Sequence, residues 1–101
     1  MALTSSRILE TKAITVTATA QTLEDLGLDT DNIAAADIAM ITVNSACYFI
    51  LGGSIDPTSS SGHYLSPLID REFPGNGIVR SLKLIRIGGS DITGFVTLAK
   101  I

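Results

Sequence analysis

Residues 14–20 contain the feature that most restricts the fold of this chain. Apolar residues and threonines alternate there, in the order Ile14, Thr15, Val16, Thr17, Ala18, Thr19, Ala20. A period of two places the apolar side chains on one face of a strand and the threonines on the other. Branching at Cβ stiffens Ile, Val and Thr, which disfavours a helix. The run therefore predicts a strand with one buried face and one solvated threonine face.

Further strands are predicted wherever apolar, β-branched or aromatic residues cluster between turn signals, at residues 37–44, 47–51, 78–87 and 92–101. The first two of these are apolar on both faces, which is typical of a central strand or of a covered outer face. Residues 65–69 predict only a short edge strand, because Pro67 has no N–H to donate. The turn residues at 88–91 predict a tight hairpin between the last two strands, with glycines at positive φ.

Residues 21–27 predict one short helical turn. Thr22 is a good N-cap, acids follow in the first turn, and Gly27 can end the turn in a left-handed conformation. A plain loop is the alternative. Residues 28–36 are interpreted as a connection, and residues 73–77 as a turn cluster because they contain Pro and two Gly.

Six to eight short strands with one helical turn predict an all-β fold, an antiparallel β-sandwich or a small barrel. A length of 101 residues fits a single domain over 1–101, in which residues 1–12 could form an extended N-terminal arm. The period-two pattern predicts a core made of Ile14, Val16, Ile38, Met40, Ile41, Val43, Phe49, Leu82, Leu84, Val96 and Leu98.

Composition limits the possible partners. Apolar residues make up 46% of the chain and charged residues only 17%, so apolar surface is expected to be covered by a further subunit. We therefore expect a homo-oligomer, a dimer or a trimer, rather than a monomer. A net charge of −3 with seven scattered basic residues does not suit a phosphate backbone, which predicts no nucleic-acid partner. The basic residues of the C-terminal half, Arg71, Arg80, Lys83 and Arg86, are expected to pair with nearby acids.

The N-terminal residues lack the long apolar segment of a signal peptide, and no apolar run approaches the roughly 20 residues that span a bilayer. We expect synthesis in a cytosol and no membrane partner. Cys47 lies in an apolar run and is expected to pack as a small hydrophobe.

Metal-binding and catalytic motifs are not predicted. Asp29, Asp31 and Asn32 have a spacing that suggests calcium, but the remaining oxygen ligands and the glycine of a calcium loop are missing. The residue types of a triad occur together in Asp56, Ser61 and His63, yet a single short loop seldom holds all three. The acids Glu24, Asp25, Asp70 and Glu72 are expected on the surface. We expect no catalytic, cofactor-binding or metal-binding residue, no cofactor and no enzymatic activity.

A polar loop between two strand patterns is the candidate contact site. Asp56-Pro57 opens a turn, and the serines that follow add turn formers rather than core. Loops on a rigid scaffold often carry binding contacts. The predicted contact residues are Asp56, Pro57, Thr58, Ser59, Ser60, Ser61, Gly62, His63 and Tyr64.

The residues around this loop resemble small virion proteins of tailed bacteriophages. The resemblance covers residues 13–101 and rests on Tyr48-Phe49-Ile50-Leu51-Gly52-Gly53, Asp56-Pro57-Thr58-Ser59, Ser61-Gly62-His63-Tyr64-Leu65, Leu84-Ile85-Arg86-Ile87-Gly88-Gly89-Ser90 and Val96-Thr97-Leu98. It implies a jelly-roll-like or sandwich-like fold of about this length, with no catalytic residues. Residues 66–72 depart from the family pattern, because they are more apolar and more charged than its Gly-rich connection.

Two functions follow as expectations. The first is a capsid decoration (cement) protein that stabilises the head shell of a phage virion, with the major capsid protein or another virion lattice as its partner. The second is a tail, neck or fibre binding module that recognises a carbohydrate or a protein through residues 54–64. Both expectations place the protein in the virion.

Overall fold

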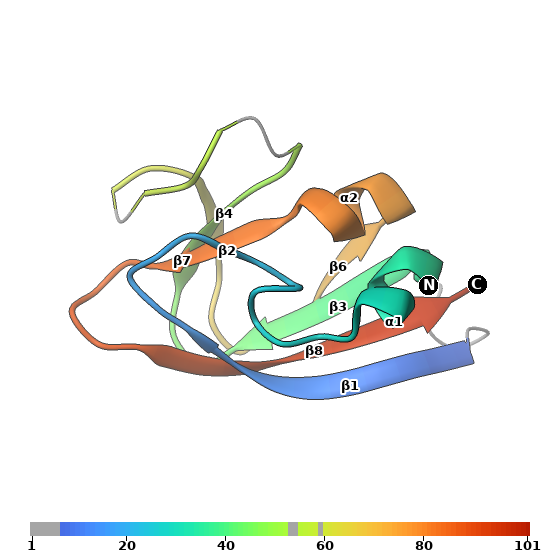
Figure 1. Ribbon diagram of the computed structural model, residues 1–101. Helices are drawn as coiled ribbons and strands as arrows, with labels where there is room; N and C mark the ends of the chain where they lie inside the picture. Colours follow the sequence, from blue (N-terminus) through green and yellow to red (C-terminus); the bar gives the residue numbers. More distant parts are fainter. Residues whose placement is uncertain (1–6, 53–54, 59) are drawn as a thin grey trace.

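The computed structural model describes residues 7–52, 55–58 and 60–101, and these residues form an all-β sandwich. Two antiparallel four-stranded sheets face each other, and two short helices lie at one end (Figure 1). The elements are β1 (Arg7–Val16), β2 (Gln21–Thr22), α1 (Thr30–Ala35), β3 (Ile38–Val43), β4 (Cys47–Ile50), β5 (His63–Leu65), β6 (Arg71–Pro74), α2 (Asn76–Ser81), β7 (Lys83–Arg86) and β8 (Ile92–Lys100).

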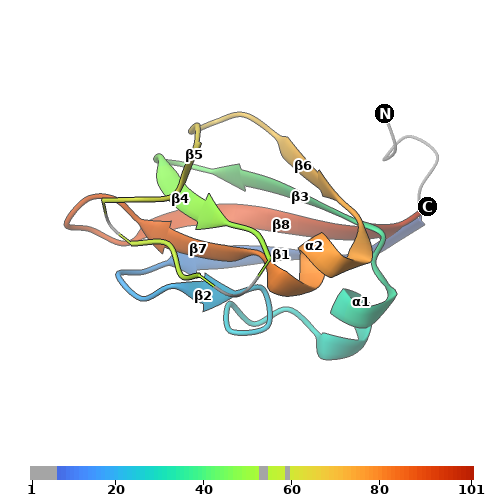
Figure 2. The same cartoon turned by 90° about the horizontal axis from the view of Figure 1, so that it is seen from above.

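The strand order is that of a jelly roll. The chain pairs from its two ends inward, β1 with β8, β2 with β7, β3 with β6 and β4 with β5. This long antiparallel ribbon is rolled up, so that β8 also pairs with β3 and β7 also pairs with β4. The resulting sheets have the orders β1-β8-β3-β6 and β2-β7-β4-β5 (Figure 2). Eight strands in two such sheets are the double-sheet jelly-roll architecture.

The core lies between the two sheets and uses the predicted alternation. Ten of the eleven predicted core residues are buried, nine of them in the cluster between the sheets and Ile38 on the outward face of β3. The exception is Met40, which is half-buried, because it shares the outward face of β3 with Thr42 and lies opposite Thr97 of β8. Buried residues from turns, helices and edge strands complete the core, namely Leu23, Leu28, Ile33, Leu65, Phe73 and Val79.

The first strand lies earlier in the chain than predicted. It begins at Arg7, so residues 7–12, interpreted as part of an arm, pair with β8 along its length. The predicted strand over residues 14–20 was wrong beyond Val16. The Thr17 hydroxyl accepts a hydrogen bond from the Thr19 N–H at 3.2 Å, and this local turn competes with the sheet ladder.

The predicted single turn at residues 21–27 is present. The Leu26 N–H donates to the Thr22 carbonyl at 3.0 Å, and the Thr22 and Asp25 side chains each accept from the other's N–H. Gly27 has φ 101°, as its terminating role requires. The first helix is α1, inside the predicted connection. Asp29 caps it by accepting from the N–H groups of Asp31 and Asn32.

The strand predicted at residues 78–87 was correct for β7 (Lys83–Arg86) but wrong for the residues before it. Residues 71–74 form β6, and the turn cluster then leads into α2 instead of a strand. Gly75 is the N-cap of α2 with φ 102°, a conformation that side chains with a Cβ rarely adopt. Val79 and Leu82 are both buried and are three residues apart, a spacing that places two side chains on one face of a helix. The composition of the same segment also fits a strand.

The predicted hairpin at residues 88–91 does not exist, because β7 and β8 belong to different sheets. The connection crosses the sandwich, and neither Gly88 nor Gly89 has a positive φ. Arg86 and Asp91 form an ion pair across it. β8 lies between β1 and β3, so the C-terminal strand offers no free sheet edge.

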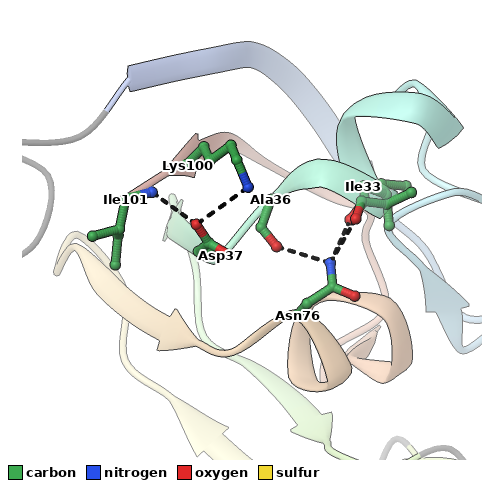
Figure 3. A network of polar contacts seen from close by, with 7 residues as sticks. Ile33, Ala36, Asp37, Asn76, Lys100 and Ile101 are labelled. Carbon is green, nitrogen blue, oxygen red and sulfur yellow. Dashed lines mark hydrogen bonds and ion pairs between the residues drawn. The ribbon is translucent and has the colours of Figure 1, made fainter.

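Two polar side chains hold the helical end of the sandwich together (Figure 3). The Asn76 amide at the start of α2 donates to three carbonyl oxygens around the C-terminus of α1, at 3.0 Å from Ile33, 3.1 Å from Ala34 and 2.8 Å from Ala36. The carboxylate of Asp37 accepts from the Ile101 N–H at 2.9 Å and lies 3.8 Å from the Lys100 ammonium. The carbonyls at the end of a short helix thus find partners within the fold.

Candidate contact surface

An exposed apolar surface lies where β5 and β6 form adjacent edges of the two sheets (Figure 2). Tyr64 of β5 is 57% exposed, and the connection to β6 adds Leu68 at 75% and Ile69 at 58%. We call these three residues the edge surface. Single exposed apolar residues are ordinary on a protein, whereas adjacent ones mark interaction sites more often.

The backbone that presents Leu68 is strained. Pro67 and Leu68 are the central residues of a turn, and Leu68 has φ 61°, the only positive φ among the described residues other than glycine. A type II turn requires a positive φ at its second central position, where Gly or Asn is usual. A leucine there costs about 1–2 kcal/mol. The turn is held in place because the Leu68 N–H donates to the Val43 carbonyl at 2.8 Å.

A shallow hollow of about 80 Å³ lies beside the edge surface, lined by Tyr64, Leu65, Ser66, Ile69 and Arg71. Its volume is well below the roughly 300–1,000 Å³ of typical small-molecule pockets, so it suits a single side chain of a partner. The Arg71 guanidinium lies 5.3 Å from the ring centroids of both Phe49 and Phe73. Cation–π contacts of this kind fix the rim of the hollow.

The predicted contact loop is anchored at both ends. Asp56 forms an ion pair with Lys83 at 2.5 Å, and Pro57 is buried. Gly62 has φ 146°, and a Cβ there would lie 2.8 Å from Cβ of Tyr48 and 3.3 Å from Cβ of Pro57. The loop therefore packs against the β4–β5 hairpin, and only part of it is free to contact a partner.

The free part is the tip and the start of β5. Thr58 and Ser61 form a small β-bridge, in which the Thr58 N–H donates to the Ser61 carbonyl at 2.9 Å. Ser59 lies outside the described residues. Ser60 is exposed, and His63 is exposed with its ring 5.4 Å from that of Phe49. Tyr64 is the one predicted contact residue that also belongs to the edge surface.

The residues weighed as a triad make other contacts. Asp56 pairs with Lys83, the Ser61 hydroxyl lies 2.8 Å from that of Thr58, and the His63 ring packs on Phe49. Among the acids, Asp25 caps the Thr22 turn and Asp70 accepts from the Thr42 hydroxyl. The described residues contain no group of three or more His, Cys, Asp or Glu placed to hold a metal ion.

Cys47 is buried, as predicted. Burial raises the pKa of its thiol to about 12, because the thiolate would lose its hydration. The thiol is therefore neutral and unreactive at physiological pH. The basic residues behave as expected in part, since Lys83 and Arg86 pair with acids whereas Arg71 packs on two aromatic rings.

Leu68 and Ile69 were missed as contact residues, although their signal was present. They follow a proline in a turn that also contains charged residues, and residues 66–72 are where the chain departs from the phage-protein pattern. The sequence could not show that Ile69 and Tyr64 line one hollow, because that depends on how the connection from β5 to β6 runs along the side of the sandwich.

Fold and surface together define the chain as an eight-stranded jelly-roll domain with an exposed apolar edge. No protein-family model, curated protein or solved structure matches it. None of the helices in the described residues is long and apolar enough to cross a membrane.

Proposed function

We propose that this protein is a non-enzymatic structural component of a phage virion, a capsid decoration protein that stabilises the head shell. Its partner is the major capsid protein or another repeating virion lattice. In this proposal the edge surface docks on the lattice, with Leu68 entering an apolar depression of the capsid protein and one capsid side chain filling the hollow beside Tyr64.

The conformation of Leu68 is the observation that carries the proposal. Glycine would fit φ 61° without strain, and Leu68 is 75% exposed, so its side chain adds little to the core. Such a residue lowers the stability of the fold and makes few contacts within its own chain, so we infer that it contacts another protein. The chemistry of the contact is apolar, because the exposed Ile69 follows Leu68 directly and the exposed Tyr64 precedes it on β5.

The fold and the resemblance support the same function. Jelly-roll sandwiches are common in viral capsid proteins, although the fold by itself does not decide function. The residues that resemble phage virion proteins occupy β4, the contact loop, β5, β7 and β8. A small surface can also act on a lattice, because many weak contacts repeated over a shell add up through multivalency.

Capsid co-sedimentation tests the proposal. The gene neighbourhood identifies the major capsid protein to use, and shells assembled from that protein are incubated with the wild type and with Leu68→Gly. We expect Leu68→Gly to fold with equal or higher stability, since it relieves the positive φ, and to lose most capsid binding. The matched control is Ile101→Ser, which removes a residue of similar exposure (67%) at the C-terminus and should bind like the wild type.

Two results would contradict parts of this proposal. Failure of the wild type to sediment with the shells removes the decoration role itself. Equal binding by Leu68→Gly and the wild type leaves the role intact but removes the edge surface from it. A melting curve of each variant shows that lost binding does not come from unfolding.

The second candidate function is a binding module that recognises a carbohydrate through residues 54–64. The exposed ring of Tyr64 favours this second function. The ring borders the hollow, and its centroid lies 6.5 Å from that of the Tyr48 ring with 70° between the two planes. An exposed aromatic ring can stack on a sugar. Glycan-array binding that is lost in Tyr64→Ala and retained in Leu68→Gly would select this function over the first.

A further inference from the structure

The outer face of the first sheet carries uncharged side chains on β1, β8 and β3, and its charged groups, Glu72 opposite Met40 and Asp70 beside Thr42, lie at the β6 edge. Strand register places four rows of side chains on this face, namely Ile8, Ala99 and Ile38, then Thr11, Thr97 and Met40, then Ala13, Phe95 and Thr42, then Thr15 and Thr93. Ala99 and Ile38 of the first row are buried, and we call the other three rows the Phe95 face. Both helices lie at the end of the sandwich, so neither of these two described elements covers the Phe95 face, which is at the bottom of Figure 1. Charge depletion around an exposed aromatic residue is the composition of interface centres.

Most hydroxyls of this face already have partners within the sheet. Thr11 and Thr97 share a hydrogen bond at 2.9 Å, Thr42 donates to Asp70, and Thr93 accepts from Asn44. Burying a hydroxyl is costly mainly when it is left without a hydrogen bond. These threonines can therefore be covered by an apolar neighbour at a smaller cost than their polarity suggests.

The centre of the face is complementary to itself. Phe95 is 58% exposed, and its direct cross-strand neighbour on the edge strand β1 is Ala13, whose methyl group rises much less above the sheet than the ring does. We call the ring the knob and the lower surface over Ala13 the depression. The two strands are about 4.8 Å apart. A twofold axis in the plane of contact, parallel to the strands and midway between β1 and β8, places Phe95 of one copy over Ala13 of the other. The same operation places the second Phe95 over the first Ala13, as an isologous interface requires.

We propose that two copies of this chain associate face to face through the Phe95 face, with Phe95 of each copy packed in the depression over Ala13 of the other. This contact is separate from the edge surface, which lies at the β5 and β6 side of the sandwich. The inference does not depend on capsid docking.

The size of the face predicts a weak dimer. A standard interface uses roughly 20–30 residues per side and buries about 800 Å² per partner. The Phe95 face supplies fewer than half as many residues, so association should depend on concentration in the micromolar range or above. Loss of a central aromatic residue is then decisive, because few residues carry the binding energy of an interface.

Sedimentation equilibrium of the purified chain, from roughly 10 µM to 1 mM, tests the inference. We expect the wild type to show a reversible dimer. Phe95→Thr removes the knob while keeping a residue that suits an exposed strand, and it should weaken association by about 30-fold or more. Ala13→Phe fills the depression and should weaken association as strongly. The control Ile55→Thr removes an apolar residue that is 67% exposed on the contact loop, and it should dimerise like the wild type.

The double variant Ala13→Phe with Phe95→Ala is the sharpest test, because it exchanges knob and depression. Under the twofold axis the new aromatic residue of one copy lies over the new alanine of the other, so dimerisation should return towards the wild-type level. A wild type that remains monomeric at the highest concentration overturns the inference. So does a dimer that is insensitive to both single variants, or a double variant weaker than either of them.

Discussion

Asn76 is expected to be the polar side chain whose loss costs the fold most. Its amide donates to three carbonyl oxygens at 2.8–3.1 Å, and these carbonyls lie at the C-terminal end of α1. A net contribution of about 0.5–1.5 kcal/mol per hydrogen bond applies to two well-directed bonds, since the amide has only two N–H groups. Asn76→Ala should therefore lower the free energy of unfolding by about 1–3 kcal/mol.

The replacement Asn76→Asp sharpens the test, because it keeps the shape of the side chain and exchanges the donor for a carboxylate. Negative oxygens would then face the carbonyl oxygens of α1, and the loss should exceed that of Asn76→Ala. Urea unfolding followed by circular dichroism measures both variants. A loss of 2 kcal/mol corresponds to a melting temperature lower by about 8–16 °C in a domain of this size.

Asn44→Ala is the matched control. Its amide also donates to a side chain, the Thr93 hydroxyl, but Asn44 is exposed and caps no helix. We expect a change within about 0.5 kcal/mol. If Asn76→Ala changes stability no more than Asn44→Ala does, the carbonyls of α1 are satisfied equally well by water and the reasoning is refuted.

Three other predictions concern the core and the loop. Burial raises the pKa of Cys47 from 9.0 to about 12, so the neutral thiol stabilises the fold fully below pH 9. The free energy of unfolding should therefore fall as the pH rises from 9 towards 12. Urea titrations across that range should show a shallower decline for Cys47→Ala than for the wild type. Gly94→Ala should lower the free energy of unfolding by about 1–3 kcal/mol, because the new Cβ would overlap the Thr42 carbonyl oxygen. Its control is Gly77→Ala in α2, which has open space around its Cβ position and should be neutral or stabilising. Thermal melting measures both variants. Glycine at positions 58, 60 and 61 should leave the melting temperature within a few degrees, since these residues are exposed; a large drop would show that the Thr58–Ser61 bridge is part of the folding unit.

The sequence by itself determined the fold class and most of the core. Alternation at Ile14 and Val16, and again at Val96 and Leu98, is a local property, because neighbouring side chains of a strand point to opposite faces whatever the strand pairs with. Burial of Cys47 followed from its apolar neighbours for the same reason. Such patterns specify which residues face inward without specifying what they face.

Local hydrogen bonding set the limits of that prediction. Asp29 looked like an interruption between strands, yet its carboxylate is the N-cap of α1. Val79 and Leu82 fit a strand as well as one turn of helix, and the structure has the helix. Short helices in this chain are decided by caps and by their packing at the end of the sandwich, since six residues are too few to be stable alone.

Only the tertiary structure decided the strand partners and therefore both proposed surfaces. Gly88 and Gly89 suggested a hairpin, but rolling the ribbon into a jelly roll sends β7 and β8 to opposite sheets. The same rolling places Phe95 next to Ala13, which is 82 positions away in the sequence, and makes β5 and β6 the sheet edges that the connection with Leu68 and Ile69 joins. Pairing at such separations depends on the whole core closing at once, because no local pattern encodes which distant strand supplies the missing hydrogen bonds.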